Sequence, residues 1–567
     1  MRDEEAVLEI TPLANRLASS LIQDHGLCEG QESLFADQIP VIDLGKLGEF
    51  SPRDHGIEEG AWELADEESI SAPDSIWKSL TEFGGKIHAA SFGFLSGAQD
   101  ARGNLVTRMK FNANGSSETC HYAHSGKVIV HWRKVGGDWR IARWETLKMH
   151  TARRSALMFS NQTRQLFSPE DYQVATRSAQ EEAIIQFALD ADNASLPKKV
   201  YYMFFDLHSD FMHPGISVVD INQDGWDDLF VTSMWRRCQL WVNQQGKGFK
   251  NMAAAYGLDV HAASTSAIFA DFDNDGDNDL VLGRSLERSL MFWNNGGRFA
   301  PDPVELPFFV TSVSAADANG DGLLDFFLCC YGSRAAAYRH LPQWPEMLLE
   351  PDDAAALRKK EETGHPYFDA PGPRNHLFIN RGDRKFVRLP VSSVPDTSRS
   401  TFQASWADYD LDGDQDIYVS NDFGPDELLR NNGNDRDGMP TFTDVSRELS
   451  DDTMKGFGMG ASWGDYNNDL KPDLFVSNMY SKAGNRIIGR LGEVDERIYF
   501  SAQGNLLFEH KDGKFLQRAG DPGFEVHKAG WAFGGQFADL NNDTWEDIYV
   551  TNGFFTAPQE VAIECDL

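Results

Sequence analysis

Six short acidic segments carry the clearest chemical signal in this sequence. One phrase recurs from Asp220 onward, as DINQDGWDDLFV, DFDNDGDNDLVL, DANGDGLLDFFL, DYDLDGDQDIYV, DYNNDLKPDLFV and DLNNDTWEDIYV. Each copy has Asp or Asn at positions 1, 3 and 5, and Asp at position 9. Ca²⁺ takes about six to eight hard oxygen ligands at roughly 2.3–2.6 Å, and alternate side chains of a tight turn can point at one centre. Each phrase therefore predicts a loop that can gather one Ca²⁺.

The residues around position 9 separate these loops from EF-hands. An EF-hand loop has about twelve residues, ends in Glu and lies between two helices. Here the closing acid is Asp at position 9, and a short β-rich run such as Ile417–Val419 follows it. Position 6 is Gly in four copies, which permits a positive φ. Position 7 would then offer its backbone carbonyl, so we expect a metal loop that joins two strands.

A second element follows the metal loop in four of the repeats. It reads LWVNQQGKGF, LMFWNNGGRF, HLFINRGDRKF and NLLFEHKDGKF, in each case an apolar run, a turn and a Phe. This pattern is typical of a β-hairpin. Each repeat thus supplies four strands, and four-stranded units repeated radially form a β-propeller.

These phrases resemble the FG-GAP/VCBS repeat of the integrin α-chain propeller and of the cartilage-acidic-protein family. The resemblance covers about Lys199 to Pro558, and SNDFGPDELLRNNGN is the closest phrasing together with GMGASWGDYNNDLKPDLFVSNMYSKAGNRI. It implies one Ca²⁺ per loop, held by positions 1, 3, 5, 7 and 9. Those positions are Asp220, Asn222, Asp224, Trp226, Asp228, Asp271, Asp273, Asp275, Asp277, Asp279, Asp317, Asn319, Asp321, Leu323, Asp325, Asp408, Asp410, Asp412, Asp414, Asp416, Asp465, Asn467, Asp469, Lys471, Asp473, Asp539, Asn541, Asp543, Trp545 and Asp547.

The residues at position 6 set the expected number of ions, and the spacing of the loops sets the expected number of blades. Leu470 and Thr544 replace Gly at position 6, and a bulky residue in the left-handed region costs about 1–2 kcal/mol. We therefore expect four to six ions, with the fifth and sixth loops in doubt. The loop starts are 51, 46, 91, 57 and 74 residues apart, so the long gaps hold insertions or a blade without a loop. Seven blades are favoured over six or eight, with Lys199–Leu207 as a closing strand.

Charge and composition exclude several classes of function. The 567 residues carry 52 basic and 87 acidic side chains, and a net charge of −35 argues against nucleic acid as a partner. The 6 Cys are too scattered for a disulfide framework and lack CxxC spacing. No apolar run is long enough to predict a membrane span. The first residues, MRDEEAVLEITPLANR, show no signal peptide.

The first 198 residues predict a different, smaller α+β domain. Residues 1–75 combine a helix over Glu4–His25 with an irregular acidic segment, and 76–172 form a β-rich accessory domain. A hairpin over Lys127–Met149, with its turn at Val135–Asp138, is similar to the last strands of the SnoaL-like cone. Residues 173–198 add a connecting helix, and the propeller occupies 199–567 with an insertion at 331–374.

Several motifs suggest chemistry but have a simpler explanation. The G-x-S-x-G match at Gly460–Gly464 places Ser462 three residues before a loop, where other repeats also have Ser, so it predicts a strand position. Arg381–Asp383 spells an adhesion tripeptide but falls in a hairpin turn. His121 and His124 fit strand residues better than a pocket.

Two further features of the propeller region suggest sites. His208 and His213 lack a third ligand with metal spacing and are expected to be structural. The Pro-rich insertion Tyr331–Arg374 could cover one propeller face, which makes Trp344, Tyr367 and Phe368 candidate ligand contacts. The alternative is a flap without a role in binding.

The sequence thus favours a calcium-binding recognition or adhesion propeller for a protein or glycan. The alternatives are a carbohydrate-active enzyme, a polysaccharide lyase or hydrolase, that uses the propeller as scaffold, and a small-molecule pocket in the N-terminal domain. No catalytic residue is identified, so the expectation leans away from an enzyme. Ca²⁺ is abundant outside the cytosol, so we expect a secreted, periplasmic or cell-surface protein despite the absent leader.

Overall fold

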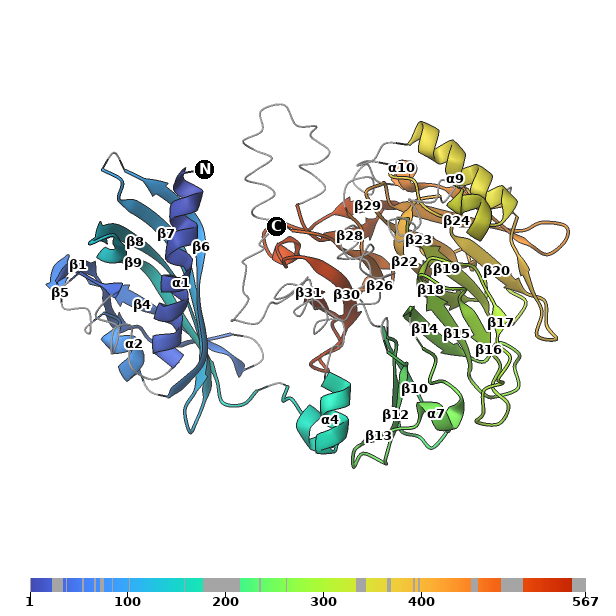
Figure 1. The fold of residues 1–567 in the computed structure, drawn as a ribbon, viewed down its shortest axis with the longest axis horizontal. Coiled ribbons are helices and arrows are strands. Elements are labelled where there is room, and N and C mark those ends of the chain that lie inside the picture. Colours follow the sequence, from blue (N-terminus) through green and yellow to red (C-terminus); the bar gives the residue numbers. More distant parts are fainter. Residues whose placement is uncertain are drawn as a thin grey trace. The chain divides into compact units, whose positions relative to one another are not determined.

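The computed structural model divides the chain into two compact units, residues 1–161 and 162–567. It describes residues 2–22, 34–36, 38–53, 56–65, 68–71, 76–83, 85–100, 102–157, 159–176, 215–233, 236–261, 263–332, 343–364, 369–390, 393–395, 398–449, 457–480 and 503–552. Each unit has its own hydrophobic core (Figure 1).

The first unit is one sheet with a helix against it. The main path of the sheet is β2-β4-β9-β8-β7-β6, and β1, β3 and β5 are attached to it. The strands are β1 Ile39–Ile42, β2 Leu44–Leu47, β3 Ser51–Pro52, β4 Glu58–Leu64, β5 Ser69–Ser71, β6 Lys86–Gln99, β7 Leu105–Ser116, β8 His121–Val135 and β9 Asp138–Arg154. The helices are α1 Arg2–Ile22 and α2 Lys78–Glu82. The hairpin predicted at Lys127–Met149 is confirmed as β8 and β9.

Helix α1 covers the sheet with the apolar stripe that its spacing predicts. Ile10, Leu17 and Leu21 are fully buried, and they pack with β6 and the interior face of the sheet. The expectation of irregular structure over residues 30–75 is wrong for β1 to β5. Those strands join the same sheet as β9. Gly60, Trp62 and Leu64 alternate with the outward Glu59, Ala61 and Glu63, which gives β4 one inward face.

The described part of the second unit forms a series of open antiparallel sheets, five of four strands and one of two. In order they are β10 Ile216–Val219, β11 Asp228–Val231, β12 Gln239–Asn243 and β13 Phe249–Asn251; β14 Ser264–Ala270, β15 Asp279–Arg284, β16 Leu290–Phe292 and β17 Val304–Glu305; β18 Val310–Ala316, β19 Asp325–Cys330, β20 His376–Asn380 and β21 Phe386–Arg388; β22 Ser400–Ala407, β23 Asp416–Asp422, β24 Glu427–Asn434 and β25 Pro440–Asp444; β26 Gly460–Gly464, β27 Asp473–Ser477, β28 Leu506–Lys511 and β29 Lys514–Gln517; and β30 Ala532–Ala538 with β31 Asp547–Asn552. They are called sheets 1 to 6.

Short helices lie between or beside the strands of the second unit. They are α3 Thr163–Leu166, α4 Pro169–Thr176, α7 Ala253–Tyr256, α8 Trp344–Leu348, α9 Pro351–Thr363, α10 Ser446–Leu449 and the 3₁₀ turn η6 Glu525–His527. Phe167, next to α3, stacks on Phe249 and meets Trp241 edge-to-face, both in sheet 1.

Consecutive sheets pack face to face through shared apolar clusters. Phe230 of sheet 1 packs with Leu280 of sheet 2, and similar clusters join sheets 2 and 3, 3 and 4, 4 and 5, and 5 and 6. The first strand of each sheet contacts the first strand of the next, from β10 through β30. Figure 1 shows the sheets following one another in colour order from green to red. Strand 1 of every repeat therefore lies on the same side of the stack.

The two long gaps between loops are insertions within a sheet. In sheet 3 the chain between β19 and β20 includes α8 and α9, and in sheet 5 residues 478–505 separate β27 from β28. Each gap thus belongs to one sheet that already has its own loop, and the described residues of the gaps form no blade without a loop. The expected helix at Arg177–Asp192 and strand at Lys199–Leu207 lie outside the described residues. Among the described residues no helix is long and apolar enough to cross a membrane.

Thr146 offers a test of the first unit's core. Its buried hydroxyl oxygen accepts hydrogen bonds from two indoles, Trp77 Nε1 at 2.9 Å and Trp144 Nε1 at 3.2 Å. Thr146→Val would leave both N–H groups without an acceptor, at about 1–3 kcal/mol each. We expect the variant to lose about 2–4 kcal/mol in denaturant unfolding followed by tryptophan fluorescence. Thr146→Ser keeps the acceptor and should lose less than about 1 kcal/mol; equal losses would contradict this role.

Candidate metal-binding site

Each of the six acidic phrases forms the loop between the first and second strands of its sheet. The loops are numbered 1 to 6 with their sheets, and position 9 begins the second strand in all six, as Asp228 does in β11. The structure therefore places every phrase at the same point of the repeat, as the sequence predicts. All six loops lie at one edge of the stack.

The position-1 Asp folds each loop around its own carboxylate. Its Oδ1 accepts the backbone N–H of position 5 at 2.9–3.1 Å, and its Oδ2 accepts that of position 6 at 2.8–3.0 Å, in every loop. Position 5 in turn accepts the N–H of position 7 at 2.9–3.1 Å. These bonds fix the carboxylates of positions 1 and 5 on the inside of one tight turn.

Two backbone positions in every loop are left-handed. Position 4 has φ between 55° and 69°, and position 6 has φ between 65° and 100°. Leu470 and Thr544 keep this conformation with φ of 65° and 74°, although they lack the freedom of Gly. The backbone therefore has the same shape in all six loops, even though loops 5 and 6 lack Gly at position 6.

The Asp at position 9 is the most deeply buried acid of each of loops 1 to 5. It is fully buried in loops 1 to 5, and in four of these its Oδ2 accepts the N–H of position 2. Burial raises the pKa of this carboxyl to about 7 in Asp279, Asp325, Asp416 and Asp473, and raises that of Asp228. A cation beside the carboxylate would offset this cost by favouring the ionised form.

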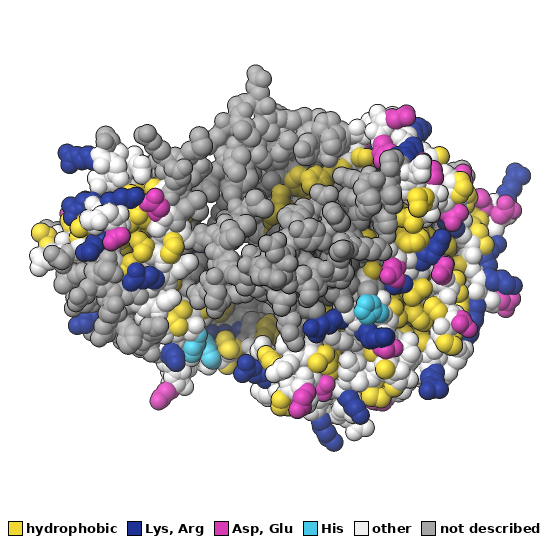
Figure 2. Space-filling model, in the orientation of Figure 1, with side chains coloured by type: hydrophobic (Ala, Val, Ile, Leu, Met, Phe, Trp, Pro, Cys, Tyr) yellow, Lys and Arg dark blue, Asp and Glu magenta, His cyan; other side chains and the backbone are white. Residues whose placement is uncertain are grey.

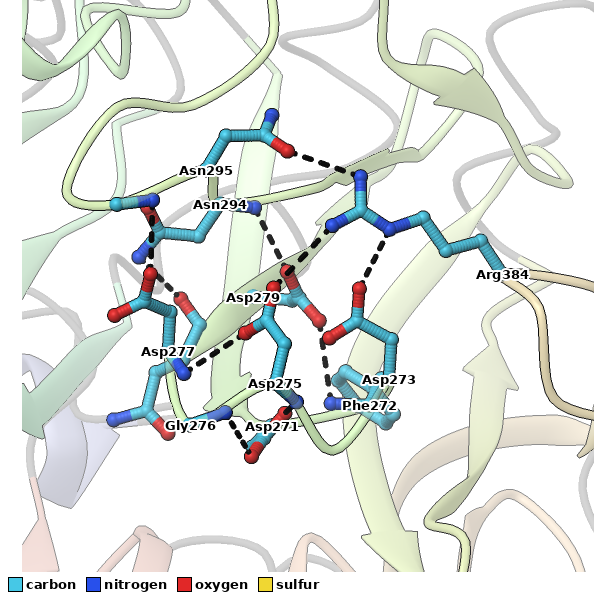
Figure 3. A network of polar contacts seen from close by, with 12 residues as sticks. Asp271, Phe272, Asp273, Asp275, Gly276, Asp277, Asp279, Asn294, Asn295 and Arg384 are labelled. Atoms are coloured by element: carbon cyan, nitrogen blue, oxygen red, sulfur yellow. Dashed lines mark hydrogen bonds and ion pairs between the residues drawn. The ribbon is translucent and has the colours of Figure 1, made fainter.

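Loops 2 and 4 bring three carboxylates within metal-binding distance. One oxygen each from Asp271, Asp273 and Asp275 lies within 4.8 Å of the others, and the same holds for Asp408, Asp410 and Asp412. Figure 3 shows the loop 2 group. Asp273 Oδ1, and Asp473 Oδ2 in loop 5, are buried with no hydrogen-bond partner. Unbonded carboxylate oxygens that face a cluster of acids fit a hard cation such as Ca²⁺.

A repeated Asn supports the loop and was not identified from the sequence. It is Asn243, Asn294, Asn380 and Asn431 in sheets 1 to 4; it ends the third strand in sheets 1 and 3, follows it in sheet 2 and lies within it in sheet 4. Its backbone N–H donates to Oδ1 of the position-9 Asp at 2.6–2.8 Å, and its Nδ2 donates to the carbonyl of position 8. In sheet 5 the backbone N–H of His510 makes the first of these bonds. In the sequence, this Asn could have been recognised because it stands two or three residues before the Gly of each hairpin turn.

Side chains at position 4 connect neighbouring loops. Gln223 Nε2 donates to Gly276 O at 2.6 Å, and Asn274 and Asn468 donate to position 6 of the following loop in the same way. Loop 3 has Gly320 at position 4 and loop 4 has Leu411, so neither can make this bond. The position-4 bonds thus link loops 1 to 3 with one another and loop 5 with loop 6.

The other candidates have structural roles where they are described. Ser462 lies on strand β26, and its Oγ accepts the N–H of Phe537 in sheet 6 at 3.2 Å. No helix follows it, so the strand interpretation is confirmed. Arg381–Asp383 forms the turn between β20 and β21, as expected, where Arg381 N–H donates to Lys385 O.

The histidine and aromatic candidates do not gather into a site among the described residues. Burial lowers the pKa of His124 to about 4, and its Nδ1 lies 2.8 Å from Thr151 Oγ1. His121 begins the same strand, β8. Trp344 is buried against Phe309 and Leu357, which leaves little of its indole for a ligand. His208, His213, Tyr367 and Phe368 lie outside the described residues.

Comparison with known proteins identifies the repeat but no close relative. Residues 220–282, 271–328 and 408–476 match the model of the FG-GAP-like repeat. No curated protein matches the chain. Among solved structures it is similar, at 14% identity each, to three proteins: the V. cholerae biofilm matrix protein Bap1 (TM-score 0.28, covering 54% of this chain and 39% of that one), a proposed scytalone dehydratase from Novosphingobium aromaticivorans (0.19, 26% and 87%) and a variant of Rd1NTF2_05 (0.17, 25% and 99%). Similarities this weak carry no argument about function.

Leu470 tests the backbone shape shared by the loops. Its side chain is 83% exposed, so replacing it loses little packing. Leu470→Gly removes the strain of a non-Gly residue in the left-handed region, about 1–2 kcal/mol. It also makes the unfolded chain more flexible, which costs the folded state about 0.5–1 kcal/mol. We expect a net gain of about 0.5–1 kcal/mol in denaturant unfolding. Leu516→Gly, at a half-exposed position of strand β29, should instead destabilise the protein. A loss of stability in both variants would contradict the assigned backbone strain.

Proposed function

We propose that the second unit is a Ca²⁺-stabilised β-propeller of the FG-GAP/VCBS type that recognises a protein or glycan outside the cytosol. The observation that carries the proposal is the repetition of one carboxylate-lined turn, with the same hydrogen bonds, at the same edge of six sheets. The match of three segments to the FG-GAP-like repeat supports the same assignment.

Electrostatics supports a metal in these loops. Positions 1, 3, 5 and 9 together hold 20 Asp in the six loops. Carboxylates a few Å apart repel one another strongly where the effective dielectric constant is low. The backbone N–H bonds stabilise part of this charge, and a divalent cation at the centre of each turn would neutralise more. Metal binding would then contribute directly to the free energy of folding.

The packing of the sheets supports a propeller. Each sheet carries one loop, faces the next sheet through an apolar cluster and places its first strand beside the first strand of its neighbour. The described sheets therefore support six blades. The seventh blade that the sequence favours would need strands from outside the described residues. Sheet 6 has two described strands, so closure of the ring would use a segment such as Lys199–Leu207.

Two exposed tryptophans support a recognition surface at the loop edge. Trp226 in loop 1 and Trp545 in loop 6 are 43% and 51% exposed. In a closed ring of six blades the first and last loops become neighbours, which would bring the two indoles to one region. Trp and Tyr are enriched at binding interfaces because they bury a large apolar area at low entropic cost.

The proposed location follows from the metal supply and the surface charge. Extracellular calcium modules work at about 10⁻⁴–10⁻³ M Ca²⁺, a concentration that the cytosol does not provide. On the face in Figure 2, acidic and basic side chains are interspersed over the described part of the second unit. The acidic excess of the chain is therefore not displayed there as one patch, which suits a protein or glycan ligand better than a cationic polymer.

The metal content tests the proposal first. We expect native mass spectrometry of the protein in millimolar Ca²⁺ to give six bound ions, and chelation to lower the melting temperature clearly. For one site filled at 100 times its dissociation constant, mass action predicts about 2.7 kcal/mol of stabilisation. A protein that binds no Ca²⁺ and melts at the same temperature with and without chelator would disprove the proposal.

Ligand binding tests the recognition surface. On glycan and extracellular-protein arrays we expect Ca²⁺-dependent binding without cleavage of the ligand. Trp226→Ala combined with Trp545→Ala should weaken that binding about tenfold or more, with the Ca²⁺ count unchanged. Val304→Ala, an exposed apolar change on the edge strand β17, serves as the control. If the ligand is degraded, the enzyme alternative replaces recognition.

A further inference from the structure

Loop 2 differs from the other loops because an arginine from another sheet enters it. Arg384 belongs to the turn between β20 and β21 in sheet 3, yet its Nε lies 2.6 Å from Asp273 Oδ2 in loop 2. Its Nη2 lies 3.4 Å from Asp275 Oδ2, and its Nη1 donates to Asn295 Oδ1 at 3.1 Å. The guanidinium also lies over the Trp293 ring, 5.0 Å from its centroid. Figure 3 shows it pointing into the acidic group.

These contacts hold the guanidinium in a fixed place. Three of its nitrogens bond to acceptors from sheet 2, while the ring of Trp293 covers its face. Arg presents a rigid planar fork that matches carboxylates, so little freedom is lost on forming each bond. Asp273 is only 10% exposed, so its ion pair with Arg384 is shielded from solvent and from salt.

Loop 4 provides an internal comparison. Loops 2 and 4 are the two with Asp at positions 1, 3, 5, 7 and 9, so each has five acids. No described residue forms an ion pair with the acids of loop 4. The two loops therefore match in their five acids, in the hydrogen bonds of position 1 and in triad spacing. They differ in that an arginine is ion-paired with the acids of loop 2, whereas Arg430 acts on Asp410 of loop 4 electrostatically without forming an ion pair.

We propose that Arg384 is a built-in counter-cation of loop 2, which stabilises the metal-free loop and makes its Ca²⁺ affinity lower than that of loop 4. This inference rests on the proposed Ca²⁺ binding and assigns a different affinity to one site. Before Ca²⁺ binds, the guanidinium neutralises part of the repulsion between Asp273 and Asp275. When Ca²⁺ binds, a cation already bonded to two of the ligand carboxylates opposes the second cation. Ligand charge is one of the main determinants of Ca²⁺ affinity in such loops.

The inference predicts that removing the charge of Arg384 changes the stability of loop 2 in opposite directions with and without Ca²⁺. Removing the charge should weaken the metal-free loop and strengthen the metal-bound one. A residue that only oriented Asp273 for the metal would produce the opposite change in affinity, because its loss would disorder a ligand. The sign of the change in Ca²⁺ affinity therefore separates the two roles.

The experiment titrates chelator-treated full-length protein with Ca²⁺ and measures the site affinities by calorimetry. The melting temperature is measured in chelator and in Ca²⁺. For Arg384→Gln we expect the weakest site to tighten about tenfold, the melting temperature in chelator to fall, and the gain on adding Ca²⁺ to grow. Arg384→Lys keeps the positive charge and should stay within about threefold of the unmodified protein. In an Asp273→Asn background, Arg384→Gln should no longer tighten any site.

Arg381 in the same turn supplies the matched control. Its guanidinium contacts Met439 Sδ and Asp437 O but no loop carboxylate, so Arg381→Gln should change no Ca²⁺ affinity. Unchanged or weaker binding in Arg384→Gln, or equal tightening in the Gln and Lys variants, would overturn the inference and leave Ca²⁺ binding itself intact. No Ca²⁺ binding by the unmodified protein would overturn both the inference and the proposed function.

Discussion

Repulsion between closely spaced carboxylates is the constraint on which the repeat unit depends. Each loop turns tightly enough for its position-1 Asp to accept two backbone N–H groups, and in loops 2 and 4 this turn brings the acids at positions 1, 3 and 5 close together. The position-9 Asp is buried at the start of the next strand, where burial first, and then the neighbouring loop carboxylates, raise its pKa in loops 1 to 5. The backbone provides donors for these groups but no positive charge. A cation, from solvent or from the chain itself, is the remaining way to stabilise them.

The loops also join features of the fold that would otherwise be independent. Position 9 begins the second strand, and the repeated Asn in or beside the third strand bonds to its carboxylate. Hairpin, loop and strand are thus fixed to one another within a sheet. The Nδ2 of Asn380 and of Asn431 also donates to the preceding loop, to Phe272 O and Ala318 O. Order in one loop is therefore coupled to its neighbour through bonds between strand ends as well as through the apolar clusters.

Much of this arrangement could be predicted from the sequence, because the signals are local. Spacing within nine residues identified the loops, and the β-branched and aromatic runs after them identified the second strands, as at Ile417–Val419. The strand β4 was missed because its alternating Gly60, Trp62 and Leu64 are hidden in an acidic stretch. Arg384 could not be predicted at all: it lies 111 residues from Asp273 in the chain, and only the stacking of sheets 2 and 3 brings them together. The first unit is likewise defined by long-range pairing, of β1 with β9, that no local pattern indicates.

The central claim is that the spaced oxygens of each turn surround one Ca²⁺. Crystals grown in millimolar Ca²⁺ and measured at a long X-ray wavelength would test it most directly, because calcium gives an anomalous signal there. The account predicts one anomalous peak in each of the six loops, at about 2.3–2.6 Å from oxygens of positions 1, 3, 5, 7 and 9. Loops without peaks, with their Asp side chains directed apart into solvent, would contradict it.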